Sequence, residues 1–273
     1  MLRSEIEKKK RALEEILQEA GKILIAYSGG VDSTFLLKVA VDCLGKENVA
    51  AFIEKSELDV PSDINFAKKF AKSLGVKVFF LKSRKLTDKN LASNPPDRCF
   101  HCKKELFSQM TKIARKCHYS AIADGSNLDD ISDYRPGNKA KSLYQVISPL
   151  QMANLTKSDI RVLSKEMGLP TWDKPPMACL ASRIPYGENI TQERLKRILK
   201  AEEHFVKLGF NIVRVRDYRN FCRIEVSDDD LEKIIQMRKK IVERLKKIGY
   251  MYITVDLEGY HTGSMNKTLP LKK

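Results

Sequence analysis

One run of small and polar residues has the chemistry of a phosphate-binding loop: Ser28, Gly29, Gly30, Val31, Asp32 and Ser33. Glycines let backbone N–H groups approach phosphate oxygens closely, and serine hydroxyls add hydrogen-bond donors. The aspartate suits the Mg²⁺ that accompanies nucleotide phosphates. An apolar segment before the run and a helical pattern after it predict a strand-loop-helix unit, in which the helix N-terminus attracts anions. This setting favours phosphate binding over a simple tight turn.

The cysteines form a second group of residues that could carry chemistry. Cys99 and Cys102 make a Cys-x-x-Cys pair, a spacing typical of metal-binding or redox sites. Cys43 and Cys117 stand in apolar or helical stretches, so we expect them to be buried and inert. Structural disulfides are rare in the cytoplasmic setting that we expect for this chain. The pair at positions 99 and 102 therefore indicates a metal or redox centre.

Strand and helix patterns alternate through the first part of the chain. The predicted strands are residues 23–26, 49–53, 76–81 and 120–123. The predicted helices are residues 4–20, 33–44, 61–74, 98–116 and 156–167. Such alternation predicts an α/β fold with a doubly wound, mostly parallel sheet. Because these sheets bind ligands beyond the carboxyl ends of their strands, we expect the glycine loop and residues 124–127 at one rim.

A second pattern begins after a proline-rich stretch at residues 170–185, which we expect to be a structured loop. The segments beyond it are a helix at 191–208, strands at 211–217 and 221–226, a helix at 228–248 and a strand at 250–256. They predict a smaller α+β domain with its own core. We therefore divide the chain into domains at residues 1–186 and 187–273.

The composition is that of an ordinary globular chain. Of the 273 residues, 42% are hydrophobic and 31% are charged. No apolar run approaches the roughly 20 residues that cross a bilayer, and the charged N-terminus lacks the pattern of a secretory signal. We expect a cytoplasmic protein with no membrane partner. The formal charge of +15 suits phosphorylated partners such as nucleotides, and it leaves nucleic acid open, although the lysines are spread along the chain.

The glycine loop resembles the PP-loop of the ATP pyrophosphatase superfamily, whose members cleave ATP between the α- and β-phosphates. A kinase-type P-loop is excluded because no Gly-Lys-Ser/Thr follows. Four further motifs accompany the loop, at residues 98–103, 124–137, 178–187 and 256–264. Together the five motifs are similar to the LarE family, the sulfurtransferases that make the nickel-pincer nucleotide cofactor. The resemblance extends over nearly the whole chain.

The resemblance implies an ATP-dependent sulfurtransferase. ATP would adenylate a carboxylate of pyridinium-3,5-biscarboxylic acid mononucleotide, and sulfur would then displace AMP. A bare carboxylate resists nucleophiles, whereas an adenylate is electrophilic. ATP and Mg²⁺ are thus expected at the loop, with Asp32 in a catalytic role and with Gly125 and Arg135 as further nucleotide-binding residues. The implied partners are the phosphorylated pyridinium substrate, a sulfide or other sulfur donor, and further copies of this chain in a homo-oligomer.

The source of the sulfur depends on three cysteines. In some LarE-type proteins the cysteine at the position of Cys179 gives up its sulfur and becomes dehydroalanine. Here Cys99 and Cys102 accompany Cys179, and family members with these three cysteines are understood to hold a [4Fe–4S] cluster with one open iron. We favour that cluster, held by all three thiolates. A zinc site that includes His101 stays open, as does a sacrificial Cys179 beside a structural Cys-x-x-Cys pair.

Arginines are the expected anchors for a substrate with a phosphate and two carboxylates. Arg183 stands four residues after Cys179. Arg214 and Arg216 alternate on a predicted strand, so they share one face, and they match the Arg-x-Arg of the family's C-terminal module. The resemblance therefore implies that Arg183, Arg214 and Arg216 bind the substrate, with its phosphate on the latter two. A solvated strand face is the alternative, and Glu202 or Glu203 is a further candidate for the pocket.

Two other functions stay open at this level. A tRNA thiolation enzyme of the same superfamily would use the same loop, a similar three-cysteine cluster and the positive charge. Such enzymes usually carry further zinc-binding Cys-x-x-Cys pairs or an RNA-binding domain, and this chain has one such pair. The second alternative is a nucleotide sensor without catalytic activity. The intact Asp32 and the three cysteines argue against a sensor.

Overall fold

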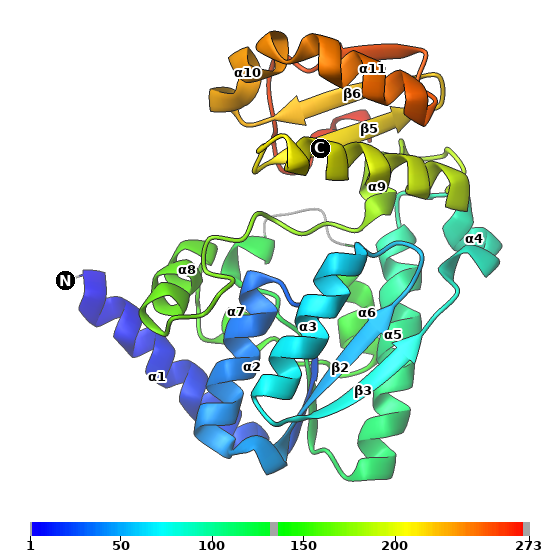
Figure 1. Ribbon diagram of the computed structural model, residues 1–273. Helices are drawn as coiled ribbons and strands as arrows, with labels where there is room; N and C mark the ends of the chain where they lie inside the picture. The colour runs from blue at the N-terminus through cyan, green and yellow to red at the C-terminus, as the bar shows by residue number, and fades with distance from the viewer. Residues whose placement is uncertain (1, 132–135, 270–273) are drawn as a thin grey trace. The chain divides into compact units, whose positions relative to one another are not determined.

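The computed structural model describes residues 2–131 and 136–269. These residues form two compact units (Figure 1). The first unit contains the chain up to Ser83 together with Cys99–Pro176, and the second contains Arg84–Arg98 together with the chain from Met177 onward. Within the described ranges, no helix is both long and apolar enough to cross a membrane. The division into residues 1–186 and 187–273 refers to functional domains and stays a prediction.

A parallel four-stranded sheet forms the centre of the first unit. Its strands are β1 (Ile23–Ala26), β2 (Val49–Lys55), β3 (Lys77–Lys82) and β4 (Ala121–Ala123). Their order is β3-β2-β1-β4, and every neighbouring pair is parallel. Because the order changes direction at β1, the loops after β1 and β4 meet at a switch point, where such sheets bind ligands. The predicted α/β fold with a parallel sheet is confirmed.

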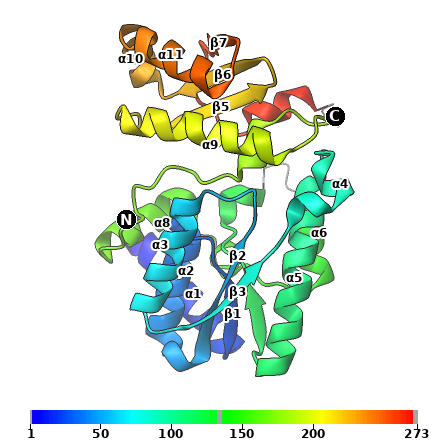
Figure 2. The ribbon, with the colours of Figure 1, turned by 45° about the vertical axis from the view of Figure 1, so that its right-hand side comes forward.

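Helices cover both faces of this sheet (Figure 2). The helices on one face are α1 (Leu2–Ala20), α2 (Val31–Leu44), α3 (Pro61–Ser73) and α8 (Lys157–Glu166), with the short α7 (Pro149–Met152) beside α1 and α2. The helices on the other face are α5 (Arg98–Cys117) and α6 (Asn138–Leu143). This is the layered arrangement that a doubly wound sheet requires, since each face of a buried parallel sheet must be covered.

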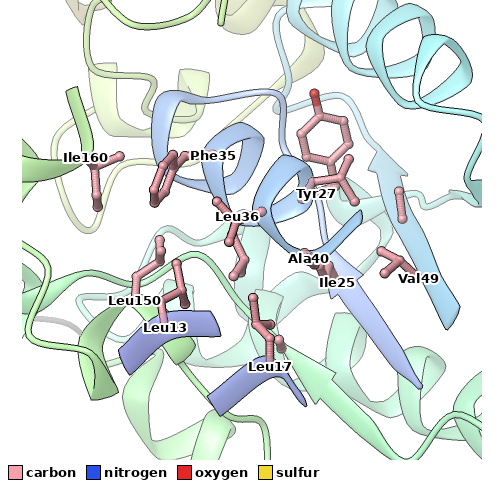
Figure 3. Packing of buried hydrophobic residues seen from close by; sticks show 14 of the residues in the cluster. Leu13, Leu17, Ile25, Tyr27, Phe35, Leu36, Ala40, Val49, Leu150 and Ile160 are labelled. Carbon is pink, nitrogen blue, oxygen red and sulfur yellow. The ribbon is translucent and has the colours of Figure 1, made fainter. Parts of the chain in front are cut away.

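The larger hydrophobic core lies between the sheet and α1, α2 and α8 (Figure 3). Leu13 and Leu17 of α1 pack there with Phe35 of α2, and all three side chains are fully buried. Ile25 of β1 belongs to this core, whereas the neighbouring Leu24 belongs to the core under α5, because strand side chains alternate between faces. Each such side chain contributes about 1.5–3 kcal/mol on burial. The core therefore holds β1 and α2 firmly on either side of the glycine loop.

A three-stranded sheet with helices packed against it forms the second unit. Its main elements are α9 (Gln192–Lys207), β5 (Val213–Tyr218), β6 (Phe221–Val226), α10 (Leu231–Gln236), α11 (Arg238–Ile248) and β7 (Tyr252–Val255). The strand order is β5-β6-β7. β5 pairs with β6 in the antiparallel sense, and β6 pairs with β7 in the parallel sense. The predicted small α+β module is thus present as a separate sheet with its own hydrophobic core.

The single helix predicted at residues 228–248 is wrong. The chain instead forms a 3₁₀ turn over Asp228–Asp230, then α10, and then α11, with Met237 between the two helices. Ile234 of α10 and Ile241 of α11 are both buried in the core of the second unit. The turn at Met237 brings both helices onto that core, and aspartates favour turns because their side chains bond to nearby backbone groups.

A segment from the first half of the sequence belongs to the second unit. It contains the short α4 (Lys89–Ala92). The N–H of Gly187 donates to the carbonyl of Asn94 at 2.9 Å, and the N–H of Ile190 donates to the carbonyl of Ala92 at 2.8 Å. The buried Asn94 amide also donates to the Ile184 carbonyl at 3.1 Å. Each pair is at least 90 positions apart in the chain, so local periodicity could not reveal these contacts.

Candidate active site

The glycine loop joins the end of β1 to the start of α2, and its own polar groups bond to one another. The hydroxyls of Ser28 and Ser33 lie 3.1 Å apart, and the N–H of Gly30 donates to Ser28 Oγ at 3.3 Å. Gly29 has a φ of +78°, and a Cβ at this position would lie 3.0 Å from the Ala67 Cβ. A side chain at position 29 would be both strained and crowded, so the turn requires glycine.

Helix α2 begins at Val31, directly after the loop. The first N–H groups of a helix have no carbonyl partner within the helix, and the bond from Thr34 N to Gly30 O at 2.9 Å opens the regular pattern here. The N–H groups of residues 31–33 therefore stand at the positive end of the helix dipole. A loop that ends on such N–H groups can bind phosphate.

Asp32 stands on the first turn of α2, and one of its carboxylate oxygens has unmet bonding capacity. Its Oδ2 accepts a hydrogen bond from Lys157 Nζ at 2.5 Å. Its Oδ1 is buried and finds no hydrogen-bond partner among the residues that the structure describes. A buried oxygen in that state costs stability, and a hard cation such as Mg²⁺ would satisfy it. The residues present therefore fit a magnesium ion at Asp32.

Two lysines contact the loop region, and sequence reasoning missed both. Lys157 comes from the first turn of α8 and pairs with Asp32. Lys174 donates to the Gly29 carbonyl at 3.2 Å and forms an ion pair with Asp63 of α3 at 2.9 Å. Lys157 is the first residue of α8, and Lys174 lies in the proline-rich loop, so neither stands in a motif that would mark it. Both place positive charge where a polyphosphate would need it.

The loop after β4 approaches the glycine loop from the neighbouring strand. Gly125 lies so close to the start of α2 that an added Cβ would be 3.1 Å from the Ser33 nitrogen. Any side chain at position 125 would therefore press on the first turn of α2. The structure thus brings Gly125 together with residues 28–33, at the rim where the strand pattern predicted it.

A buried ionic network underlies this rim. The carboxylate of Asp124 accepts hydrogen bonds from the Ser148 hydroxyl at 2.7 Å and the Ser126 hydroxyl at 2.8 Å. Lys103 lies 3.4 Å from it and Lys141 lies 3.9 Å from it. Burial alone would raise the pKa of Asp124, but the two lysines and the two hydroxyls outweigh burial and lower its pKa. Asp124 is therefore held as an anion that fixes the loop after β4.

The cysteines differ in their surroundings. Cys99 is exposed and Cys102 is half-buried on the first turn of α5, three positions apart and so on the same side of that helix. Cys179 is exposed in the second unit, directly before a 3₁₀ turn at Leu180–Arg183. Within the described ranges, no group of three or more His, Cys, Asp or Glu side chains is arranged to hold a metal ion. The three-cysteine centre therefore stays a prediction.

The remaining thiols correct one expectation. Cys43 and Cys117 are half-buried rather than buried, because each stands toward the end of its helix. Cys222 on β6 is the cysteine in a hydrophobic core. Its burial, and then the nearby Asp217, raise the pKa of the Cys222 thiol to about 12. That thiol is therefore unreactive at neutral pH.

The three predicted arginines lie with two glutamates in a cluster inside the second unit, where Arg223 also pairs with Glu225 at 3.0 Å. Arg183 makes a two-pronged ion pair with Glu202, with Nε–Oε1 and Nη2–Oε2 distances of 2.9 Å each. Arg216 of β5 makes the same kind of pair with Glu225 of β6. The side chains of Arg183 and Arg216 are almost wholly buried. The alternative of a solvated strand face is therefore wrong, because both faces of β5 are covered.

Arg214 is placed differently from the other two. Its Nη1 donates to the Val213 carbonyl at 2.7 Å, and its guanidinium lies 5.1 Å from the centroid of the Tyr260 ring. Burial and then the positive charge of Arg183 lower the pKa of Arg214, and Glu202 only partly compensates. A guanidinium in such an excess of positive potential is suited to bind an anion.

The predicted site residues thus fall into two sets. Residues 28–33 and Gly125 come together at the rim of the first unit. Arg183, Arg214 and Arg216 come together in the second unit, where Arg183 also donates to the Cys179 carbonyl at 3.2 Å. The predicted nucleotide-binding residue Arg135 lies outside the described residues.

Comparison with known proteins places the chain among its relatives. Residues 5–97 match the family model for NAD synthase. An uncharacterised protein of Synechocystis sp. is 38% identical over 266 residues, which are 97% of this chain and 99% of that protein. The pyridinium-3,5-bisthiocarboxylic acid mononucleotide synthase of Lactiplantibacillus plantarum is 36% identical over 261 residues, 96% of this chain and 95% of the synthase. The NH₃-dependent NAD⁺ synthetase of Methanocaldococcus jannaschii is 27% identical over 212 residues, 70% of this chain and 78% of the synthetase.

Identity of 36% across nearly the whole of both chains decides the family. The chain belongs to the LarE family. The LarE resemblance that the motifs indicated is therefore confirmed, and so is membership of the wider group of PP-loop enzymes that use ATP. The roles of the individual LarE-type residues stay predictions.

Proposed function

We propose that this LarE-family chain uses ATP to adenylate a carboxylate of pyridinium-3,5-biscarboxylic acid mononucleotide and then replaces AMP with sulfur. One observation carries the proposal: the chain is 36% identical, over 96% of its length, to a synthase of the bisthiocarboxylic acid mononucleotide. The loop geometry supports the nucleotide half of the reaction. The arginine cluster of the second unit supports a substrate that carries several negative charges.

The first step consumes ATP. A carboxylate oxygen of the substrate attacks the α-phosphorus, the bond between that phosphorus and the bridging oxygen breaks, and pyrophosphate leaves. The N–H groups at the start of α2, the Ser28 and Ser33 hydroxyls and Lys157 are placed to stabilise the charge that develops on the leaving group. Asp32 would hold Mg²⁺ through Oδ1, which has no hydrogen-bond partner in the described part of the chain, and the ion would neutralise phosphate charge there.

The second step consumes sulfur at the oxidation level of sulfide. The sulfur attacks the acyl carbon, the bond from that carbon to the AMP oxygen breaks, and AMP leaves together with a proton. No oxidant or reductant is needed, because sulfide becomes a thiocarboxylate without a change in electron count. The adenylate makes this substitution feasible, since AMP is a far better leaving group than oxide.

We propose further that Cys99, Cys102 and Cys179 bind a [4Fe–4S] cluster that delivers this sulfur. The donor set fits: three thiols are the usual ligands for such a cluster when one iron is left open, and the members of this set are exposed or half-buried. The cluster, when bound, would supply the sulfide that attacks the adenylate. A sacrificial Cys179 would give the same product once per chain.

The arginine cluster supports a role for Arg183, Arg214 and Arg216 in substrate binding. Among them, Arg214 is the residue we assign to the substrate phosphate, because Arg183 and Arg216 both lie close enough to add positive charge around its guanidinium. Arg183 and Arg216, which form ion pairs with Glu202 and Glu225, then act mainly by fixing the surroundings of Arg214. This refines the expectation that the substrate phosphate binds to both Arg214 and Arg216.

The test is an anaerobic incubation of the full chain with ATP, Mg²⁺, sulfide and the pyridinium biscarboxylic acid mononucleotide. We expect AMP and pyrophosphate to form only when the pyridinium substrate is present, and we expect its mass to rise by the exchange of oxygen for sulfur. Pyrophosphate release that requires tRNA, and not the pyridinium compound, would contradict the proposal. Mass spectrometry of the protein separates the two sulfur sources, because sacrifice of Cys179 removes one sulfur atom per turnover.

A further inference from the structure

A segment near the C-terminus, Gly259–Ser264, contacts the arginine cluster at two points, and the reaction described above assigns it no role. It follows β7 and lies within the second unit. Gly259 has a φ of +70°, and a Cβ at this position would lie 3.1 Å from the Val226 carbonyl oxygen and 2.5 Å from an Asp228 oxygen. The next N–H, that of Tyr260, donates to the same Val226 carbonyl at 2.8 Å. The start of the segment is therefore fixed tightly against the end of β6.

The first contact joins Tyr260 to Arg214. The Arg214 guanidinium lies 5.1 Å from the centre of the Tyr260 ring, which is within the range of a cation–π interaction. The Arg214 side chain is 8% exposed, so the interaction is largely desolvated and correspondingly stronger. The ring therefore restricts where the guanidinium of Arg214 can point.

The second contact joins Ser264 to the Arg216–Glu225 pair. Arg216 Nη2 donates to Ser264 Oγ at 2.8 Å, and Ser264 Oγ lies 3.0 Å from Glu225 Oε1 and 3.2 Å from Oε2. The hydroxyl accepts from the arginine and donates to the glutamate. It thus bridges the Arg216–Glu225 ion pair, whose carboxylate also accepts from Arg223 Nη2 at 3.0 Å, and adds a hydrogen bond to this buried network. Arg216 also donates to the Ser182 carbonyl at 3.1 Å, close in sequence to Cys179.

We infer that Tyr260 and Ser264 are positioning residues for substrate binding. Tyr260 orients the Arg214 guanidinium toward the phosphate of the mononucleotide. Ser264 holds the neighbouring Arg216–Glu225 pair in place. This inference rests on the proposed function, because it takes Arg214 as the phosphate anchor. Because the Arg214 guanidinium is already held in one orientation, less side-chain entropy is lost when the anion binds. The segment therefore acts on affinity for the phosphorylated substrate and leaves ATP binding and the chemical steps alone.

The test compares Tyr260→Leu, Tyr260→Phe and Ser264→Ala with the unaltered chain in the substrate-dependent release of pyrophosphate. Loss of the aromatic ring should raise KM for the pyridinium mononucleotide about tenfold, which corresponds to a desolvated cation–π contact of about 1.4 kcal/mol. Tyr260→Phe keeps the ring and should restore KM. Ser264→Ala should raise KM about threefold. The kcat and the KM for ATP should stay within about twofold throughout.

Tyr252→Leu is the matched control, because Tyr252 lies on β7 in the same unit with its side chain in solvent. It should leave all constants unchanged. A second substrate, the same pyridinium nucleoside without its phosphate, should show no KM difference between Tyr260→Leu and the unaltered chain. If the tenfold change persists with that substrate, or if kcat and both KM values change together, the positioning role is wrong.

Arg214→Ala separates this inference from the proposed function. If Arg214→Ala leaves KM for the mononucleotide unchanged, the phosphate anchor itself is wrong, and the proposal on which the inference rests fails. If Arg214→Ala raises KM while Tyr260→Leu and Ser264→Ala do not, the anchor stands and the positioning inference alone is overturned.

Discussion

The two carboxylate oxygens of Asp32 have different surroundings. Its Oδ2 is paired with Lys157, and its Oδ1 is buried without a hydrogen-bond partner among the described residues. Sequence reasoning could assign magnesium to this residue from its type and its place in the loop. It could not find Lys157, because the two residues are 125 positions apart and only the packing of α8 on α2 brings them together.

Replacing Asp32 with asparagine removes the charge and keeps the size of the side chain. We expect formation of AMP to fall by roughly 10²-fold or more, because the site loses both its magnesium ligand and the partner that orients Lys157. The rate of AMP formation with saturating substrate measures this, and circular dichroism confirms the fold. Asp42→Asn is the control, since Asp42 lies on the same helix and pairs with Lys38 at the surface. Equal rates for Asp32→Asn and the control variant would overturn the assigned role.

The arginine cluster shows where residue-level reasoning stops. The alternation of Arg214 and Arg216 correctly placed both on one strand, β5. Their glutamate partners could not be predicted, because Glu225 comes from the paired strand β6 and Glu202 from α9. A register of two strands must be known before a cross-strand ion pair can be recognised.

At the scale of elements, the strands and most helices followed from the sequence because their signals are local. Runs such as residues 23–26 are apolar on both faces, as a buried parallel strand requires, and the structure has β1 there. The break at Met237 was missed because no glycine or proline marks it. The membership of residues 84–98 in the second unit was missed because it depends on contacts with residues 184–190.

Helix α8 begins with a capping box formed by Thr156 and Asp159. The Thr156 hydroxyl accepts from the Asp159 N–H at 3.2 Å, and the Asp159 carboxylate accepts from the Thr156 N–H at 3.0 Å. Asp159 also pairs with Lys9 of α1 at 2.8 Å. The box fixes the first turn of α8, and that turn presents Lys157 to Asp32. The cap therefore serves the site as well as the helix.

Thr156→Ala should lower the free energy of unfolding by about 1 kcal/mol, which is the usual cost of losing an N-cap side chain. Urea unfolding at neutral pH measures the change. We also expect a several-fold loss in the rate of AMP formation, because a frayed first turn holds Lys157 less well. Thr156→Ser keeps the hydroxyl and should recover most of both losses. If Thr156→Ser is as damaging as Thr156→Ala, the hydroxyl is not what stabilises this turn.

At the scale of the whole molecule, the proposed functional residues are divided between the two units. The nucleotide loop, Cys99 and Cys102 belong to the first unit, and Cys179 and the arginine cluster belong to the second. The LarE-family relationship covers both, since the similarity to the synthase extends over 96% of this chain. The similarity to the NAD synthase family model, in contrast, ends at residue 97. The glycine loop therefore lies in the part of the chain that this family model matches, whereas Cys99, Cys102, Cys179 and the arginine cluster lie beyond it.

The proposed sulfur-delivering centre requires residues of both units, because Cys99 and Cys102 belong to the first unit and Cys179 belongs to the second. We expect anaerobic reconstitution with iron and sulfide to give broad visible absorption and about four irons per chain. Cys99→Ala, Cys102→Ala and Cys179→Ala should each remove most of that iron, because two thiolates cannot hold a cubane that is built on three. Iron analysis and the visible spectrum of each variant measure this.

Cys43→Ala and Cys117→Ala are the matched controls for the cysteine variants. Both thiols are half-buried on helices of the first unit, and neither belongs to the proposed donor set, so both variants should reconstitute fully. If the unaltered chain binds one zinc ion and no iron, the cluster is wrong and a zinc site takes its place. If the cluster forms but sulfur transfer continues in Cys99→Ala with loss of one sulfur atom from the protein, Cys179 is the donor and the cluster is not. Repeated turnover that stops in each of the three variants, and in neither control, is the result that a cluster-delivered sulfide requires.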